Sequence, residues 1–153
     1  MNISDVHRGP LVAEIMSGEE DCTLRRAYDV AWTCDGKSRL LTIPAGVRFW
    51  PGVQKMPLIA RMFLRMIGVT KMFPAAAAHD PLYESQGGRR PIRVNGEWLW
   101  LSLTDGERNR LLISRRECDL LSFHLSRAEH LRPWAGKIIR FVLRHFGKDA
   151  WDD

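Results

Sequence analysis

Cysteine is scarce in this chain of 153 residues, which contains only Cys22, Cys34 and Cys118. An odd number of cysteines at such wide spacings argues against a disulfide framework, and no histidine stands at the spacing that a zinc site would need. We therefore expect free thiols in a reducing compartment, for which the cytoplasm of a bacterium is the simplest candidate.

Long apolar runs are also absent. No stretch approaches the roughly 18 to 20 apolar residues that span a bilayer. The first ten residues, MNISDVHRGP, lack the basic start and apolar centre of a signal peptide. We expect neither a transmembrane segment nor a signal peptide. The length suits one domain with its own core, which we place over residues 1–153 with its core at 22–151.

Three common catalytic or nucleotide-binding motifs are missing. The chain has no G-x-S-x-G nucleophile elbow, no G-x-x-x-x-G-K-[ST] phosphate loop and no G-x-G-x-x-G dinucleotide fingerprint. The sequence therefore gives no support for a serine hydrolase built on that elbow or for nucleotide binding through those loops.

Positive charge is concentrated in one part of the chain. The net charge is +5, and the segment from Arg108 to Lys148 is rich in arginine and lysine but has only Glu117, Asp119 and Glu129 as acids. Such a segment can attract phosphate groups, nucleic acid or an anionic membrane, or it can be an ordinary solvated face. No reading motif for nucleic acid accompanies the charge, so we expect no sequence-specific nucleic-acid partner.

The first third of the sequence predicts strands. β-favouring residues from Cys22 to Thr33 are followed by Asp35-Gly36, a hairpin turn, and by a returning strand at 38–43. A second hairpin is predicted at about 91–103, because Asn95-Gly96 is flanked by alternating residues. We interpret residues 89–106, which surround this second hairpin, as an insertion.

Four segments predict helices. They lie at 57–68, at 73–84 with Pro81 inside, from the capping box Ser114-x-x-Glu117 to about Arg127, and at 133–147. The fold class that we expect is α+β, a small N-terminal antiparallel sheet packed on three to four helices.

The last predicted helix has two faces. Lys137, Arg140, Arg144 and Lys148 form a basic stripe at helical spacing, which we take as a candidate binding surface for an acidic protein or for phosphate. We expect the apolar side, with Trp134 and Phe141, to pack on the helix at 73–84.

The stretch FPAAAAHDPLYES at residues 73–85 carries the clearest chemical signal. On a helix, Tyr83 shares a face with both His79 and Asp80. His79 and Asp80 are adjacent and point about 100° apart, so we expect another carboxylate to orient the histidine. Asp119 is the natural candidate, and we predict that its side chain lies within hydrogen-bond distance of His79. In that arrangement His79 is a general base, with Asp119 and Tyr83 as catalytic partners.

Each of these residues also has an ordinary structural interpretation. His79 can be a packed, hydrogen-bonded core residue, Tyr83 a core residue with its hydroxyl at the edge, and Asp119 a partner of Arg115 or Arg116. Asp80 is a candidate metal ligand for a hard cation. We nevertheless expect no cofactor and weak or no calcium binding, because such an ion needs more oxygens than this part of the chain supplies.

The order of these motifs resembles a family of unknown function found in tailed bacteriophages and prophages. The residues that carry the resemblance are Ile43-Pro44-Ala45-Gly46, Ala75 to Tyr83 with His79-Asp80, Ser114 to Asp119, and Arg144 to Trp151. The resemblance implies a virion or tail-associated protein, made in the host bacterial cytoplasm and later found in the virion, with other phage virion proteins as partners.

The chain departs from the pattern of that family in the loop after the first motif. Members carry an acid and a serine there, whereas residues 47–56 contain neither Asp, Glu nor Ser. Position 81 is a proline where the family tends to have an aromatic residue. The missing carboxylate weakens any metal site built on that loop.

A second resemblance concerns the site alone. Secreted phospholipases A2 also place a His-Asp pair and a tyrosine on one helix, with a distant aspartate that orients the histidine. By this similarity His79 would activate water, Asp80 would bind calcium, and Asp119 with Tyr83 would orient His79. The sequence thus leaves two functions open: a phage structural component with a buried polar site, and a His-based hydrolase of esters or phospholipids in the host envelope.

Overall fold

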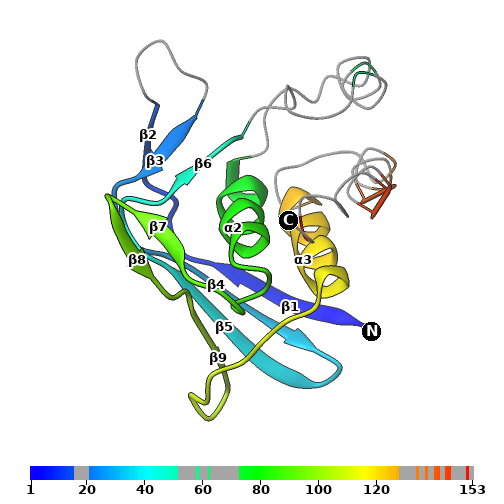
Figure 1. Cartoon of the computed structure of the whole chain (residues 1–153). Helices are drawn as coiled ribbons and strands as arrows, with labels where there is room; N and C mark the ends of the chain where they lie inside the picture. Colours follow the sequence, from blue (N-terminus) through cyan, green and yellow to red (C-terminus); the bar gives the residue numbers. More distant parts are fainter. Residues whose placement is uncertain are drawn as a thin grey trace.

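The computed structural model describes residues 1–15, 21–51 and 73–127, together with residues 58, 62, 134, 137, 140, 141, 144, 145 and 151. Element labels follow Figure 1, in which the first labelled helix is α2.

The main sheet has four antiparallel strands in the order β1-β4-β5-β9. They are β1 (Ile3–Arg8), β4 (Tyr28–Cys34), β5 (Lys37–Ile43) and β9 (Ser102–Asp105). Alternate side chains of β4 are buried from Tyr28 to Cys34, which gives the sheet one core face. The predicted turn between β4 and β5 is confirmed, because Asp35 and Gly36 both adopt positive φ angles, of 49° and 77°.

Two smaller sheets flank the main one. The first is formed by β2 (Ala13–Ile15), β3 (Cys22–Leu24) and β6 (Arg48–Phe49), in the order β2-β3-β6. The second is the hairpin of β7 (Ile92–Val94) and β8 (Glu97–Leu99). Its turn residues Asn95 and Gly96 have φ angles of 51° and 83°, so the hairpin predicted from this dipeptide is confirmed.

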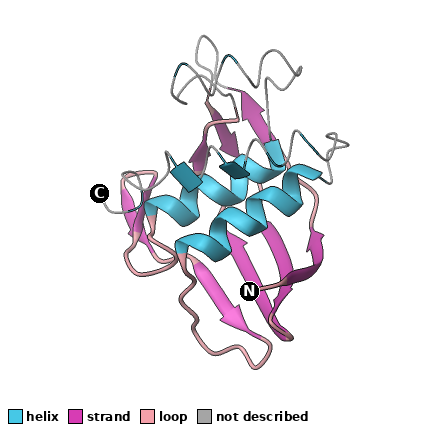
Figure 2. Ribbon diagram, turned by 90° about the vertical axis from the view of Figure 1, so that its right-hand side faces the viewer, coloured by secondary structure: helices cyan, strands magenta, loops and turns pink. Residues whose placement is uncertain are grey.

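The helices α2 (Phe73–Glu84) and α3 (Arg115–Arg127) lie side by side on one face of the main sheet (Figures 1 and 2). Residues Ala75 to Ala78 of α2 are buried, and their small side chains let the two helices approach closely. Pro81 does not end α2, which continues to Glu84. Ser114 caps α3 as predicted, since its Oγ accepts the amide N–H of Glu117 at 3.2 Å.

The predicted fold class, a small sheet packed on three to four helices, is wrong. The described residues form nine strands in three sheets and only two helices, so most of this structure is sheet. The expectation failed because β1 and β9 pair with strands far away in the sequence, and no local turn signal indicates such pairing. The helices predicted at 57–68 and 133–147 lie, apart from isolated residues, outside the described part of the chain.

The expected insertion at 89–106 also needs correction. The hairpin β7-β8 lies within it, but β9 in the same stretch pairs with β5 and is the edge strand of the main sheet. Leu103 of β9 is buried in the core. This segment therefore completes the main sheet.

In the described ranges, neither helix has the length and apolar character required to cross a membrane.

Candidate functional site

Packing of α2 against α3 creates a cluster of polar side chains between the two helices. α2 contributes His79, Asp80 and Tyr83 from its second half, and α3 contributes Asp119 from its second turn. We refer to these four residues as the polar knot. The helical spacing that predicted a shared face for His79, Asp80 and Tyr83 is thus consistent with the structure, and Asp119 lies where the sequence analysis placed it.

Asp119 is the centre of the knot. The hydroxyl of Tyr83 donates a short hydrogen bond to Asp119 Oδ1, and His79 Nε2 lies 3.8 Å from the same oxygen. On its other side, Asp119 Oδ2 is 3.7 Å from Nε of Arg115, one turn earlier on α3. The buried carboxylate therefore has a neutral donor and two cationic partners, once His79 is protonated.

The imidazole of His79 is enclosed. Its side chain is 15% exposed, and its ring stacks on the Tyr83 ring with centroids 3.9 Å apart and an interplanar angle of 30°. The Trp151 ring meets the other edge of Tyr83 at 5.0 Å. The predicted hydrogen bond between His79 and Asp119 is wrong in its geometry, because 3.8 Å exceeds hydrogen-bond distance. The contact is an ion pair when His79 carries its second proton.

Asp80 fixes a loop and also faces His79. Its Oδ2 accepts the backbone N–H of Trp50 at 2.6 Å, and its Oδ1 lies 3.5 Å from His79 Nδ1. The sequence analysis assigns the orientation of His79 to a carboxylate other than Asp80, because adjacent helical side chains point about 100° apart. In the structure each ring nitrogen of His79 faces a carboxylate, Asp80 at Nδ1 and Asp119 at Nε2.

The surroundings of the knot shift the pKa values of its members. Burial disfavours the charged form of His79, but the carboxylates of Asp119 and Asp80 outweigh it, and the pKa of His79 is raised above its usual 6.5. Burial, reinforced by the hydrogen bond to Asp119, raises the pKa of Tyr83 well above its ordinary value. Burial likewise raises the pKa of the neighbouring Cys118 thiol, so this thiol stays protonated and unreactive.

The proposed role of Asp80 as a metal ligand finds little room in this geometry. Both of its oxygens already have partners, in Trp50 and His79, whereas a calcium ion needs about six to eight oxygens. Over residues 1–15, 21–51, 73–127 and the single described positions, no three His, Cys, Asp or Glu side chains gather as a metal site. Weak or absent calcium binding stays a prediction.

The basic stripe is only partly described, since Lys148 lies outside the described residues. Lys137 is exposed. Arg140 and Arg144, in contrast, line a pocket on α3. The expected packing of the apolar side on α2 is wrong for the residues that can be seen, because Trp134 and Phe141 are 44% and 57% exposed.

Three contacts in and around the knot were missed by the sequence analysis. They are the amide of Trp50 on Asp80, the ring of Trp151 on Tyr83, and the backbone carbonyl of Arg144, which accepts a hydrogen bond from Arg115. Each joins segments that are far apart in the sequence, and a backbone donor or acceptor leaves no residue-type signal. Trp151 alone had a signal, as the last residue of the phage-family motif.

No protein-family model matches this chain, and no curated protein or solved structure matches it at a significant level. The resemblances to the phage family and to secreted phospholipases A2 therefore stay predictions drawn from short motifs.

Proposed function

We propose that this chain is a structural component of a tailed-phage particle, and that its polar knot is a latch that holds α2 against α3. The observation that carries the structural role is the enclosure of His79. Its Nε2 is buried and makes no hydrogen bond to the described residues, and the ring has Tyr83 on one face and a carboxylate opposite each nitrogen.

Enclosure and charge both argue against a general base. A base needs a free lone pair on its ring and a path for the substrate to reach it. The raised pKa of His79 keeps the ring protonated to higher pH than in an ordinary histidine, so the lone pair that a base needs is available over a narrower pH range. A protonated His79 between Asp80 and Asp119 is, in contrast, well suited to hold carboxylates of two helices together.

The phage assignment rests on the motif resemblance, and it is supported by the positions of the motif residues in the structure. Three of the four motif segments meet in the knot: His79, Asp80 and Tyr83 from the second, Asp119 from the third, and Trp151 from the fourth. Gln86 adds a further link, because its side-chain amide donates to the Trp151 carbonyl at 2.7 Å. Contacts that tie several segments together are those expected in a component whose role is to keep one shape.

The hydrolase alternative has less support. In the phospholipase arrangement one ring nitrogen faces the orienting aspartate and the other faces a water molecule. Here the nitrogen that would face water, His79 Nδ1, is 3.5 Å from Asp80 Oδ1. The other carboxylate oxygen of Asp80, the expected calcium ligand, accepts the backbone N–H of Trp50.

Two experiments test the proposal. In the first, particles from an induced lysogen that carries this gene are purified on a density gradient and analysed by mass spectrometry. We expect the chain in the particle fraction, with other virion proteins. Its recovery only in the soluble lysate would contradict the assignment to the virion.

In the second experiment, wild-type protein and the His79→Gln variant are compared in hydrolysis of a chromogenic ester and of phospholipid vesicles, and in urea unfolding. His7→Gln, at an exposed histidine on β1, is the matched control. We expect no hydrolysis by any of the three proteins and a lower unfolding free energy only for His79→Gln. Hydrolysis that His79→Gln abolishes while the protein stays folded would support the alternative.

A further inference from the structure

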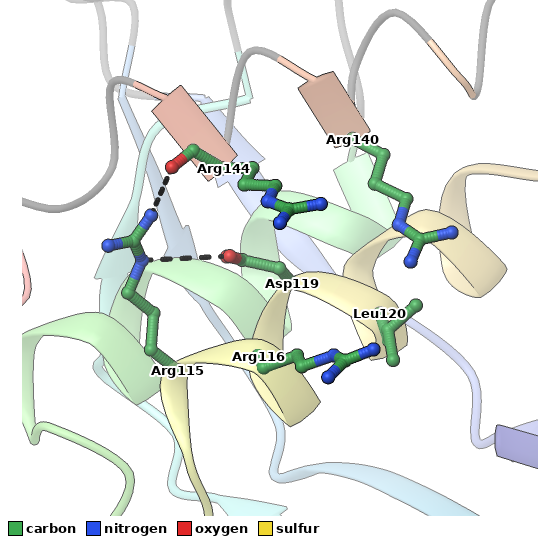
Figure 3. Close-up of a pocket in the computed structure, with 6 residues that line it drawn as sticks. All are labelled: Arg115, Arg116, Asp119, Leu120, Arg140 and Arg144. Carbon is green, nitrogen blue, oxygen red and sulfur yellow. Dashed lines mark hydrogen bonds and ion pairs between the residues drawn. The ribbon is translucent and has the colours of Figure 1, made fainter. Parts of the chain in front are cut away.

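A pocket of about 420 Å³ lies on the outer side of α3, next to the polar knot. Figure 3 shows Arg140 and Arg144 reaching toward α3, whose Arg116 and Leu120 lie across the pocket from them. Its lining consists of Arg115, Arg116, Asp119, Leu120, Arg140 and Arg144. The volume falls in the range of small-ligand sites, about 300 to 1,000 Å³.

Among the described residues, the charge of the lining is strongly one-sided, with four arginines and one aspartate. That aspartate is already engaged, because Asp119 accepts the Tyr83 hydroxyl and lies beside Arg115. Over the described ranges, no carboxylate pairs with Arg116, Arg140 or Arg144. Converging guanidinium groups repel each other, and a bound anion would relieve this repulsion.

We propose that this pocket binds a compact, multiply charged phosphate compound, such as a pyrophosphate or a sugar bisphosphate. A guanidinium group presents a rigid fork of N–H donors that matches two phosphate oxygens at once. Several such forks from two segments fit an anion with oxygens on several sides. The charge of the phosphate groups carries the recognition, because all of the described lining residues except Leu120 are charged.

Arg115 positions the two walls of the pocket. Its guanidinium group donates to the backbone carbonyl of Arg144 and also lies beside Asp119 (Figure 3). One side chain thus connects α3, the segment that carries Arg140 and Arg144, and the polar knot. A ligand held between Arg116 and Arg140 would bridge the same two walls and stabilise their contact. This inference stands independently of the phage assignment.

The test is isothermal titration calorimetry of the full chain with sodium pyrophosphate, and with sulfate at equal ionic strength. We compare the wild type with a double variant, Arg116→Gln with Arg140→Gln, in which both residues are exposed and make no contact in the knot. The matched control is Arg26→Gln with Arg108→Gln, which removes two charges from exposed sites outside the pocket. Thermal unfolding of all three proteins checks that each is folded.

We expect pyrophosphate to bind the wild type and the control about equally, and the pocket variant at least about tenfold more weakly. Sulfate should bind at least about tenfold more weakly than pyrophosphate, and binding should weaken as salt screens the charges. No binding of pyrophosphate to the wild type, or an equal loss in the control, would overturn the proposal.

A competition experiment distinguishes a small phosphate compound from the phosphate backbone of a nucleic acid. A sugar bisphosphate should displace pyrophosphate, and a short single-stranded oligonucleotide should not. Displacement by the oligonucleotide but not by the sugar bisphosphate would overturn the proposal in favour of a nucleic-acid backbone.

Discussion

At the scale of single residues, the protonation of His79 depends on two opposing effects. Burial favours the neutral ring, and the carboxylates of Asp119 and Asp80 favour the imidazolium. The combined effect of the two carboxylates is the larger, so the pKa of His79 is raised. Because folding raises the pKa of His79 above 6.5, the stabilisation from its proton is fully present below about pH 6.5. The same stabilisation disappears as the pH rises through the folded-state pKa.

Tyr83 gives the first test at this scale. Tyr83→Phe keeps the ring stack on His79 but removes the hydroxyl that donates to Asp119. We expect it to lower the free energy of unfolding by about 1 to 3 kcal/mol, because a buried carboxylate loses a donor. The measurement is urea unfolding with an unchanged m-value.

Tyr28→Phe is the matched control for this prediction. Tyr28 is buried, as Tyr83 is, and its hydroxyl donates to the Pro74 carbonyl at 3.4 Å. A long bond to a neutral acceptor is weak, so we expect a loss below about 1 kcal/mol. Equal losses in the two variants would argue against a special role for the Tyr83–Asp119 bond.

The members of the knot could be predicted from the sequence only where helix geometry determines which side chains are neighbours. The spacing of three and four residues placed Tyr83 beside His79 and Asp80, and the apolar face of α3 placed Asp119 at its edge. The roles inside the knot could not be predicted, because they depend on partners from distant segments. Asp80 faces His79 and holds the Trp50 amide, which no local pattern indicates.

At the scale of elements, the exit from α2 is closely constrained. Gly87 has a φ angle of 67°, its N–H donates to the Leu82 carbonyl at 2.8 Å, and its carbonyl accepts the Ile113 N–H at 3.1 Å. A Cβ atom at Gly87 would lie 2.2 Å from the Ile113 carbonyl oxygen. The close approach sets the path of the chain that leads into α3, and so the position of Asp119.

We expect Gly87→Ala to be strongly destabilising and Gly36→Ala to be mild. Both glycines have positive φ angles, but a Cβ at Gly36 meets no atom within 4 Å. Gly36→Ala should therefore lower the free energy of unfolding only by the energy of placing an alanine in the left-handed conformation, about 1 to 2 kcal/mol. Gly87→Ala should lower it by at least about 2 kcal/mol more, because of the clash. Chemical unfolding measures both, and similar losses would mean that the contact with Ile113 relaxes at little cost.

The elements that could be predicted share a local signal. Asp35-Gly36 and Asn95-Gly96 fix the turns of two hairpins, and Ser114 fixes the start of α3. β1 and β9 have no such signal: β1 pairs with β4 and β9 with β5 across long stretches of chain. Tertiary packing decides these pairings, and this explains why the sequence analysis underestimated the share of sheet.

At the scale of the whole molecule, α3 is tied down on two sides. Toward the main sheet, Glu117 accepts the indole N–H of Trp32 at 3.0 Å, and its carboxylate lies 3.5 Å from the Arg39 guanidinium. Toward α2, Asp119 joins the polar knot. The buried carboxylates of Glu117 and Asp119 therefore connect α3 to the main sheet and to α2. The loss of either carboxylate should weaken the packing of the whole helix.

We infer that the charged His79–Asp119 pair is the latch between α2 and α3. Its most direct test is a double-mutant cycle by urea unfolding, with His79→Gln, Asp119→Asn and the double variant. Two pH values are compared: about 5.5, below the unfolded-state pKa of histidine, and a value at which the NMR titration of His79 shows a neutral ring.

We expect a favourable coupling of about 1 kcal/mol or more at the lower pH, and a clear decrease once His79 has lost its proton. A coupling near zero at the lower pH, or one that does not change with the protonation of His79, would contradict the account.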